Sequence, residues 1–445
     1  MRLFHTIAVS ALALATTLSA VPALADDAAT VAAIEAEYDN YLAPLFVDFH
    51  QNPELSFLES RTAAKMAAEL KAAGLEVTTG VGGTGVVAML RNGDGPLIML
   101  RADMDGLPVE EKSGLDYASK ATQVGQDGAT YAVMHACGHD VHITSMVGTA
   151  RRLMAMKDQW SGTAMFIVQP AEELVGGAKA MIEGGLYKQF GKPDYALAFH
   201  VAADLATGKV SASEGTQYSG SSAVELTVPG IATHGASPHL GRDPVYIAAQ
   251  IITALQSIDS REVSPLKPVV VTVGAMHAGT RGNIIPDNAV LQLTVRANDE
   301  ETRALALAAI ERIAVNIGKA HGLPDDKLVQ MKITGGTPVT ANDPALAQRL
   351  NAVMQRELGA AAFEPFVQMD MGAEDFAYFV AAEHGVPGYY FAVGGTPQAA
   401  IDAEANGGPA VAGHHSPLFK VAPRESVVLG TRAMVAAVLD LAPVK

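Results

Sequence analysis

The chain has 445 residues, of which 49% are hydrophobic and 18% are charged, and its formal net charge is −16. This balance predicts a globular protein with a large buried core and excludes an intrinsically disordered chain. The negative charge argues against a nucleic acid or an anionic membrane as a partner, and we expect neither.

The first 25 residues have the pattern of a signal peptide. Arg2 precedes an apolar stretch from Ile7 to Leu18, and Ala23-Leu24-Ala25 supplies the small residues of a cleavage site. The alternative is an ordinary N-terminal helix. We expect an exported protein, periplasmic or secreted. No later segment holds the roughly 18 consecutive apolar residues of a membrane span, so we expect no stable membrane association.

Helices and strands alternate through the first half of the sequence. Two helices are predicted, over residues 31–49 and 60–73. Apolar runs bounded by turn residues predict five strands, and a helix over Val141–Met156 lies between the third and the fourth. The strands are expected at Leu75–Thr79, Val86–Leu90, Leu97–Leu100, Thr163–Val168 and Tyr195–Phe199. This alternation predicts an α/β fold, with a three-layer domain around a mostly parallel sheet.

The order of predicted elements changes after Ser222 to strand, helix, strand, strand, helix, strand. These elements are expected at Ala223–Val228, Asp243–Ile258, Val269–Val273, Ala289–Val295, Glu300–Gly318 and Leu328–Ile333. The order is that of a ferredoxin-like βαββαβ domain. We therefore expect residues 219–334 to be inserted into a discontinuous catalytic domain, formed by residues 26–218 and 335–445.

Three of the predicted strands, the third, fourth and fifth, lead directly into polar residues. The polar segments that follow them are Arg101–Asp105, Gln169–Glu173 and His200. In open α/β sheets, ligands bind beyond the carboxyl ends of the strands. The sequence therefore predicts a site that carries carboxylates and a histidine at this edge of the sheet.

A dense set of candidate metal ligands runs from His135 to His142. It holds Cys137, His139 and Asp140, and the thiol and imidazoles suit zinc or a neighbouring transition metal better than calcium or magnesium. Cys137 is the only cysteine, so no intrachain disulfide can form. The alternative is a buried free cysteine beside solvent-facing histidines.

Two further segments carry paired side chains that suit a hydrolytic site. A metal hydrolase needs one carboxylate to hold the metal and a second to accept a proton from water, and Glu172-Glu173 offers both. Near the C-terminus, His414 and His415 precede Ser416-Pro417 on a predicted turn. The alternatives are a solvated pair of glutamates and two surface histidines.

Taken together, these segments resemble the aminoacylase, hippurate hydrolase and auxin-conjugate hydrolase branch of the co-catalytic metallopeptidases. The resemblance covers roughly residues 100–420, and its specificity comes from the combination of segments. The matching segments are Arg101–Pro108, His135–His142, Gln169–Glu173, Thr233–Pro238, Gly282–Pro286, Met371–Phe376 and His415–Pro417. The resemblance implies that the inserted domain serves as a lid and as a dimerisation domain. We therefore expect a homodimer.

The resemblance also implies two divalent metal ions in each subunit. Zinc is favoured by the ligand types, with manganese, cobalt or nickel as alternatives. Glu172 matches the general acid/base, and Asp105 matches a residue that supports a metal ligand from behind. His414 remains an alternative to His415 as the last ligand. The matching ligand positions are Cys137, His139, Glu173, His200 and His415.

Two residues of the inserted domain match substrate-contacting positions. The resemblance implies that His234 reaches the active site of a partner subunit and stabilises the developing oxyanion. It implies that Asn283 contacts the substrate, and Arg281 is a candidate for binding a carboxylate on charge alone. The alternative is structural, with His234 at a strand end and Asn283 in a turn.

The resulting prediction is a metal-dependent amidohydrolase that cleaves the amide bond of a small N-acyl amino acid. The cations would activate the attacking water and polarise the carbonyl oxygen, while Glu172 moves the proton. A dipeptidase or carboxypeptidase with the same chemistry is the alternative among enzymes. An exported metal- or ligand-binding protein without catalysis is the alternative from another class.

Overall fold

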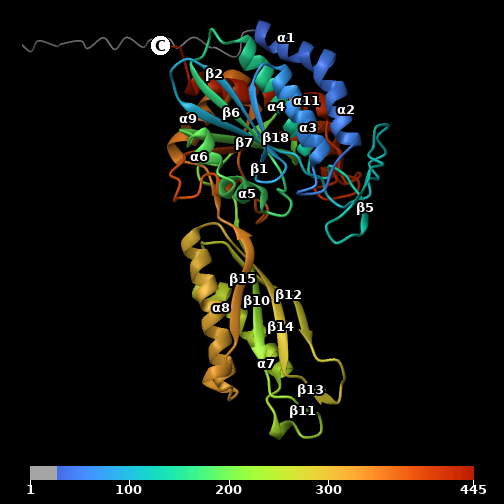
Figure 1. Cartoon of the computed structure of the whole chain (residues 1–445), viewed down its shortest axis with the longest axis vertical. Helices are drawn as coiled ribbons and strands as arrows, with labels where there is room; N and C mark the ends of the chain where they lie inside the picture. The colour runs from blue at the N-terminus through green and yellow to red at the C-terminus, as the bar shows by residue number, and fades with distance from the viewer. Residues whose placement is uncertain (1–27, 445) are drawn as a thin grey trace, which may run out of the picture.

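The computed structural model describes residues 28–444, so the predicted signal peptide (residues 1–25) lies outside the described residues and stays a prediction. Figure 1 shows two lobes joined end to end. The predicted α/β fold class is confirmed, because a large mixed sheet is covered by helices and a smaller sheet forms the second lobe. Among residues 28–444, no helix has the length and apolar character needed to cross a membrane.

The large lobe is built on an eight-stranded sheet with the order β1-β2-β6-β3-β7-β18-β8-β17. Strand β3 runs parallel to β6 and β7, and β7 runs parallel to β18, so the centre of the sheet is parallel. The strands are β1 (Glu76–Val81), β2 (Gly85–Asn92), β3 (Leu97–Asp103), β6 (Gly162–Gln169), β7 (Tyr195–Ala206), β8 (Val210–Ala212), β17 (Phe363–Pro365) and β18 (Gly388–Thr396).

Helices cover both faces of this sheet, which makes three layers. The alternation along β2 explains why both faces are apolar: Val86 and Ala88 pack in one core, while Val87 and Met89 pack in the other. One face carries α1 (Ala28–Glu37), α2 (Ala43–Gln51), α3 (Ser60–Ala72), α4 (His139–Ala155), α9 (Pro344–Leu358) and α11 (Pro423–Leu441). The opposite face carries α5 (Gly177–Glu183) and α6 (Leu186–Phe190).

The small lobe has the ferredoxin-like element order that the sequence predicts. Its sheet has the order β12-β14-β10-β15, and α7 and α8 pack on one face through residues such as Ile251 and Ile310. The elements are β10 (Gly220–Pro229), α7 (Pro244–Leu255), β12 (Val269–Ala278), β14 (Asn288–Ala297), α8 (Glu300–Ala320) and β15 (Gln330–Thr337).

Short elements complete the chain. The pair β11 (Thr233–His234) and β13 (Ile284–Ile285) lies at the tip of the small lobe, far from the large sheet (Figure 1). The pair β9 (Thr216–Tyr218) and β16 (Thr340–Ala341) lies beside the link between the lobes. The remaining elements are the hairpin β4 (Thr122–Val124) and β5 (Thr130–Ala132), and α10 (Gln398–Ala405).

Two predicted strands end later than the sequence indicates. Strand β3 continues to Asp103, and β7 continues through His200 to Ala206. The expectation that His200 follows the end of its strand is therefore wrong. The cause is pairing with β18, whose Ala392 lies opposite His200 and whose Thr396 lies opposite Ala206. The helix predicted over residues 31–49 is also interrupted, by a π-helical turn at Tyr38–Leu42.

Gly138 makes a sharp turn between two of the predicted ligands, at the start of α4. Its φ angle is +85°, a left-handed conformation that favours glycine. A Cβ atom at this position would lie only 2.3 Å from Val201 Cγ1 of β7. Both constraints require glycine here, and the turn brings Cys137 and His139 toward the same side of the sheet.

A buried arginine connects distant parts of the large lobe. The Arg101 side chain is inaccessible to solvent and donates to Asp103 Oδ2 at 2.6 Å, to Glu374 Oε1 at 2.7 Å and to Gln169 Oε1 at 2.7 Å. These partners belong to β3, to β6 and to the segment that follows the small lobe. Each charge is therefore compensated inside the protein, where an unpaired charge would be costly.

Replacing this arginine tests the network. Arg101→Met should destabilise the large lobe by about 3–5 kcal/mol, because it leaves Asp103 and Glu374 buried without their partner. Urea unfolding, followed by circular dichroism, measures the shift. In the control Arg61→Met, the lost partner is Asp48 on the surface, and the expected loss is about 0–1 kcal/mol. Equal shifts in the two variants would contradict this account.

Candidate metal centre and active site

The structure brings all five predicted metal ligands together. They form two groups of three side chains that share Cys137, one with His139 and His200 and the other with Glu173 and His415. Within each group, the candidate ligand atoms lie within 4.8 Å of one another. Side chains from α4, from the turn before it, from β7 and from two further loops therefore converge on one place.

Hydrogen bonds fix which ring nitrogen of each histidine faces this place. His139 Nδ1 lies 2.9 Å from the backbone oxygen of Asp105, and His200 Nδ1 lies 2.7 Å from the backbone oxygen of Val201. Carbonyl oxygens only accept, so both Nδ1 atoms carry a proton, and in the neutral imidazole that can bind a cation each Nε2 keeps a lone pair. His200 Nε2 is 3.4 Å from the sulfur of Cys137.

Buried polar atoms without partners show that the cluster fits a cation. Within residues 28–444, His139 Nε2 and Glu173 Oε1 are buried and have no hydrogen-bond partner. Glu173 Oε2 lies 3.2 Å from Nε2 of His415, whose side chain is 55% exposed. Buried polar groups are normally satisfied, so these unpaired atoms point to a bound group that accepts electron pairs. Thiol, imidazole and carboxylate together suit a zinc-type cation.

The charge distribution also favours a cation. Burial raises the pKa of Cys137 and of Glu172 well above their ordinary values, and neighbouring carboxylates raise both further. Burial lowers the pKa of His139, but the charges of Asp103 and Asp105 outweigh it and raise that pKa to about 10. In all three groups the neighbouring carboxylates raise the pKa, which reflects a buried excess of negative charge that a divalent cation would neutralise.

Asp105 positions both the loop that carries Glu172 and Glu173 and the ring of His139. Its Oδ1 accepts a hydrogen bond from Glu172 N at 3.1 Å, and its Oδ2 accepts from Glu173 N at 3.0 Å and from the Ser56 hydroxyl at 2.6 Å. Asp105 Oδ1 also lies 3.3 Å from His139 Nδ1. Asp105 therefore lies behind His139, and its predicted role of supporting that ligand stays a prediction.

Two other histidines in the region have ring nitrogens engaged elsewhere, both nitrogens in His142 and Nε2 in His414. His142 Nδ1 lies 2.5 Å from Asp103 Oδ1, and its Nε2 accepts from Val201 N at 2.9 Å. His414 Nε2 lies 3.0 Å from the Val201 oxygen, and burial lowers the pKa of His414 to about 3. The geometry therefore favours His415 over His414 as the last ligand.

Strained backbone gathers around the cluster. Four non-glycine residues between 28 and 444 have a positive φ angle, and three of them lie in the two ligand-bearing loops. They are Ala171 at +48°, Val175 at +54° and His415 at +63°. Such conformations cost on the order of 1–3 kcal/mol each and concentrate at functional sites. Here they turn Glu172, Glu173 and the His415 ring toward the cluster.

Glu172 lies beside the cluster with a free carboxylate. Its side chain makes no hydrogen bond with another described residue, and its Oε2 is 3.9 Å from His139 Nε2. Glu374 and Asp375 lie close to it, but Arg101 and Gln169 already hold their oxygens. A carboxylate that is buried, unpaired and high in pKa is suited to accepting and releasing a proton.

His234 and Asn283 do not lie at this cluster within the same chain. Both are exposed at the tip of the small lobe, where Asn283 O accepts from Gly235 N at 2.8 Å. His234 Nδ1 accepts from Ala236 N at 3.0 Å. Their predicted contact with the active site of a partner subunit stays a prediction.

Arg296 on β14 is a residue of this site that was not predicted from the sequence. This half-buried arginine lines a cavity of about 540 Å³ together with Cys137 and Glu172. No carboxylate in residues 28–444 pairs with it; its Nε donates to Thr294 Oγ1 at 3.3 Å, and burial lowers its pKa. The sequence did offer one signal. Side chains alternate between the two faces of a strand, so Arg296 lies on the same face as Thr294 and on the face opposite to core residue Val295. Arg281 is exposed and does not line this cavity.

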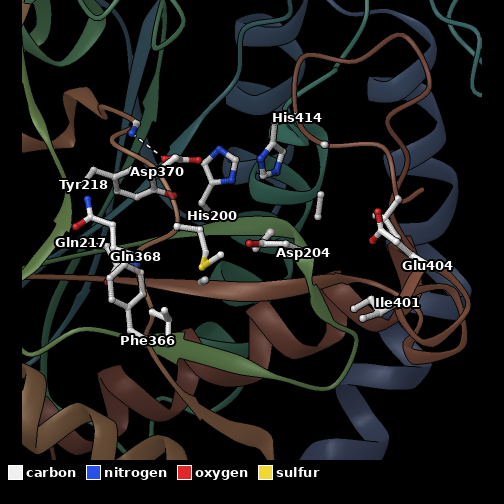
Figure 2. A pocket seen from close by; sticks show the side chains of 18 residues that line it. His200, Asp204, Gln217, Tyr218, Phe366, Gln368, Asp370, Ile401, Glu404 and His414 are labelled. Carbon is white, nitrogen blue, oxygen red and sulfur yellow. Dashed lines mark hydrogen bonds between the residues drawn. The ribbon is translucent and has the colours of Figure 1, made fainter. Parts of the chain in front are cut away.

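A second cavity of about 600 Å³ adjoins the first (Figure 2). Both are lined by His200, Tyr218, Asp370 and His414, so they meet beside the metal cluster. Phe366, Ile401 and other apolar side chains form part of its wall. The two cavities together leave room for groups on both sides of a bond that lies at the cluster.

Comparison with known proteins identifies the family. Residues 99–407 match the family model for peptidase family M20/M25/M40. The hippurate hydrolase of Campylobacter jejuni is 41% identical over 66% of this chain and 73% of that protein. The N-acetyl-L-cysteine deacetylase of Bacillus subtilis is 37% identical over 67% and 68%. Thermostable carboxypeptidase 2 of Saccharolobus solfataricus is 35% identical over 75% and 84%.

Solved structures agree. A protein from methicillin-resistant Staphylococcus aureus, described as an aminohydrolase, is 30% identical and superposes with a TM-score of 0.82 over 93% of this chain and 98% of its own. A dinuclear metal-binding peptidase of the M20 family from Bacillus subtilis is 27% identical, with a TM-score of 0.72 over 92% and 98%. The chain therefore belongs to peptidase family M20/M25/M40, and it is a metal-dependent hydrolase of the amidohydrolase branch.

Proposed function

We propose that the enzyme hydrolyses the amide bond of small N-acyl amino acids with two divalent cations bound at the cluster. The observation that carries the proposal is the pair of ligand groups that share Cys137, with the free carboxylate of Glu172 beside them. The hippurate hydrolase and N-acetyl-L-cysteine deacetylase relatives support this choice of substrate.

Five side chains would hold the cations. Cys137, His139 and His200 would hold one, and Cys137, Glu173 and His415 would hold the other. The thiolate and imidazoles favour zinc, and manganese, cobalt or nickel would suit the same ligands. When bound, such cations polarise a carbonyl oxygen and lower the pKa of water.

Glu172 would move the proton during the reaction. It accepts a proton from the attacking water, whose oxygen forms a bond to the amide carbon. It then donates that proton to the leaving nitrogen as the carbon–nitrogen bond breaks. Burial and the neighbouring carboxylates raise the pKa of Glu172, which suits it to both steps.

Arg296 would bind the carboxylate of the substrate. Its guanidinium lies in the same cavity as Glu172 and has no carboxylate partner among residues 28–444. A planar guanidinium binds a carboxylate through two parallel hydrogen bonds. The carboxypeptidase relative supports a second candidate, a substrate with a C-terminal carboxylate, of which dipeptides are the simplest form. A panel of N-acyl amino acids and dipeptides separates the two.

The small lobe would complete the site in a homodimer. His234 is exposed at the tip of this lobe, beside the exposed side chains of Ile231, Leu240 and Ile284. Such a tip suits contact with a second copy, where His234 would reach the partner's cluster.

Glu172→Gln tests the proton step. The variant should lose about 10²–10⁴-fold in kcat, because glutamine can neither accept nor donate the proton. Its metal content should equal that of the wild type, because Glu172 belongs to neither ligand group that shares Cys137. Metal analysis and hydrolysis of N-acyl amino acids measure both quantities. Wild-type turnover in the variant would refute the role of Glu172.

Mixing two inactive variants tests whether His234 acts across the dimer. Glu172→Gln and His234→Ala subunits should each be nearly inactive alone. After the two variants are unfolded and refolded together, half of the dimers should contain one subunit of each kind. In each such two-fold dimer, one of the two sites combines an intact Glu172 with an intact His234 from the partner. The mixture should therefore regain about a quarter of wild-type activity. The mixture would stay inactive if His234 served its own subunit.

A further inference from the structure

Tyr218 lies where the two cavities meet. It is the last residue of β9 and lines both the cavity that contains Glu172 and the neighbouring cavity. Figure 2 shows its ring extending into the cavity on the side where His200 lies. The ring packs edge-on against Tyr390, with centroids 5.3 Å apart and an interplanar angle of 81°. The hydroxyl is therefore held in a defined place beside the metal cluster.

The Tyr218 hydroxyl has no hydrogen-bond partner among residues 28–444. Its neighbour Tyr390 is different, because that hydroxyl donates to Glu374 Oε2 at 2.6 Å. The other oxygen of Glu374 accepts from Arg101 and from Phe376 N. This carboxylate is thus already engaged, and the Tyr218 hydroxyl remains available to a molecule in the cavity.

The hydroxyl keeps its proton at neutral pH. Burial raises the pKa of Tyr218 well above its ordinary value, and the charges of Glu374, Cys137 and Glu172 raise it further. Tyr218 is therefore a hydrogen-bond donor rather than a phenolate. Tyr218 lines the same cavity as Cys137 and Glu172, where the proposed function places the substrate amide.

We propose that Tyr218 is a catalytic residue that donates a hydrogen bond to the carbonyl oxygen of the scissile amide as this oxygen gains negative charge. The assignment rests on the proposed function. A donor that is fixed before the reaction and aimed at developing charge stabilises the transition state more than the bound substrate. Tyr218 supplies this donor from the same chain, independently of the distant His234.

The variant Tyr218→Phe tests the assignment, because it removes the hydroxyl and keeps the ring. For hydrolysis of an N-acyl amino acid, kcat should fall about 10²–10³-fold with little change in KM. Metal content should be unchanged. The affinity for a phosphinic analogue of the tetrahedral intermediate should fall by a similar factor, whereas the affinity for the product amino acid should stay the same.

Tyr187→Phe is the matched control. The Tyr187 hydroxyl donates to Phe379 O at 2.7 Å and lines neither cavity, so its loss should leave kcat and analogue affinity unchanged. If the wild type is active and Tyr218→Phe has the same kcat, the Tyr218 assignment alone is overturned. The same holds if the variant binds the analogue and the product equally more weakly than the wild type. A wild type that hydrolyses no N-acyl amino acid would overturn the proposed function, and the assignment with it.

Discussion

The geometry of the site depends on the buried carboxylate of Asp105. Its two oxygens accept hydrogen bonds from the backbone N–H groups of Glu172 and Glu173, and its own backbone oxygen fixes the ring of His139. Charge-assisted hydrogen bonds of this kind are the strong ones inside a protein. They hold the loop after β6 against the start of α4. The adjacent residues Glu172 and Glu173 are thereby fixed in the different positions that their two proposed roles require.

The two lobes contribute differently to this site. The large lobe supplies the candidate metal ligands and Glu172, whereas the small lobe supplies Arg296 to the same cavity from β14. A change in the angle between the lobes would therefore alter the cavity without disturbing the cluster. This division suits an enzyme whose substrate-binding groups close around a rigid catalytic centre.

Local patterns explain how much of the molecule could be predicted from the sequence. Strands β10 and β14 and helix α8 each bury one face. Their apolar residues therefore recur at strand or helix spacing, and the ferredoxin-like order of elements could be predicted from that spacing. The ligand-bearing segments were visible because thiol, imidazole and carboxylate groups are dense there. The convergence of Cys137 with His415 was expected from the family resemblance, and the structure supplies its geometry.

Long-range contacts explain what was missed. The apolar run of β7 stops at Phe199, but pairing with β18 extends the strand through His200, and no local signal reports that pairing. The ion pair between Arg101 and Glu374 likewise joins a residue that precedes the inserted lobe in the sequence to one that follows it. Arg296 was missed because a single arginine in a strand is usually a surface residue. Its proposed function follows from its position in the cavity, which only the fold shows.

Anomalous X-ray diffraction from crystals of the zinc-loaded enzyme would locate the bound cations. We expect two peaks at the zinc edge, one beside Cys137, His139 and His200 and one beside Cys137, Glu173 and His415. A single peak, or a peak between Asp103 and His142 with none beside Cys137, would contradict the shared-thiolate site on which the proposed function rests.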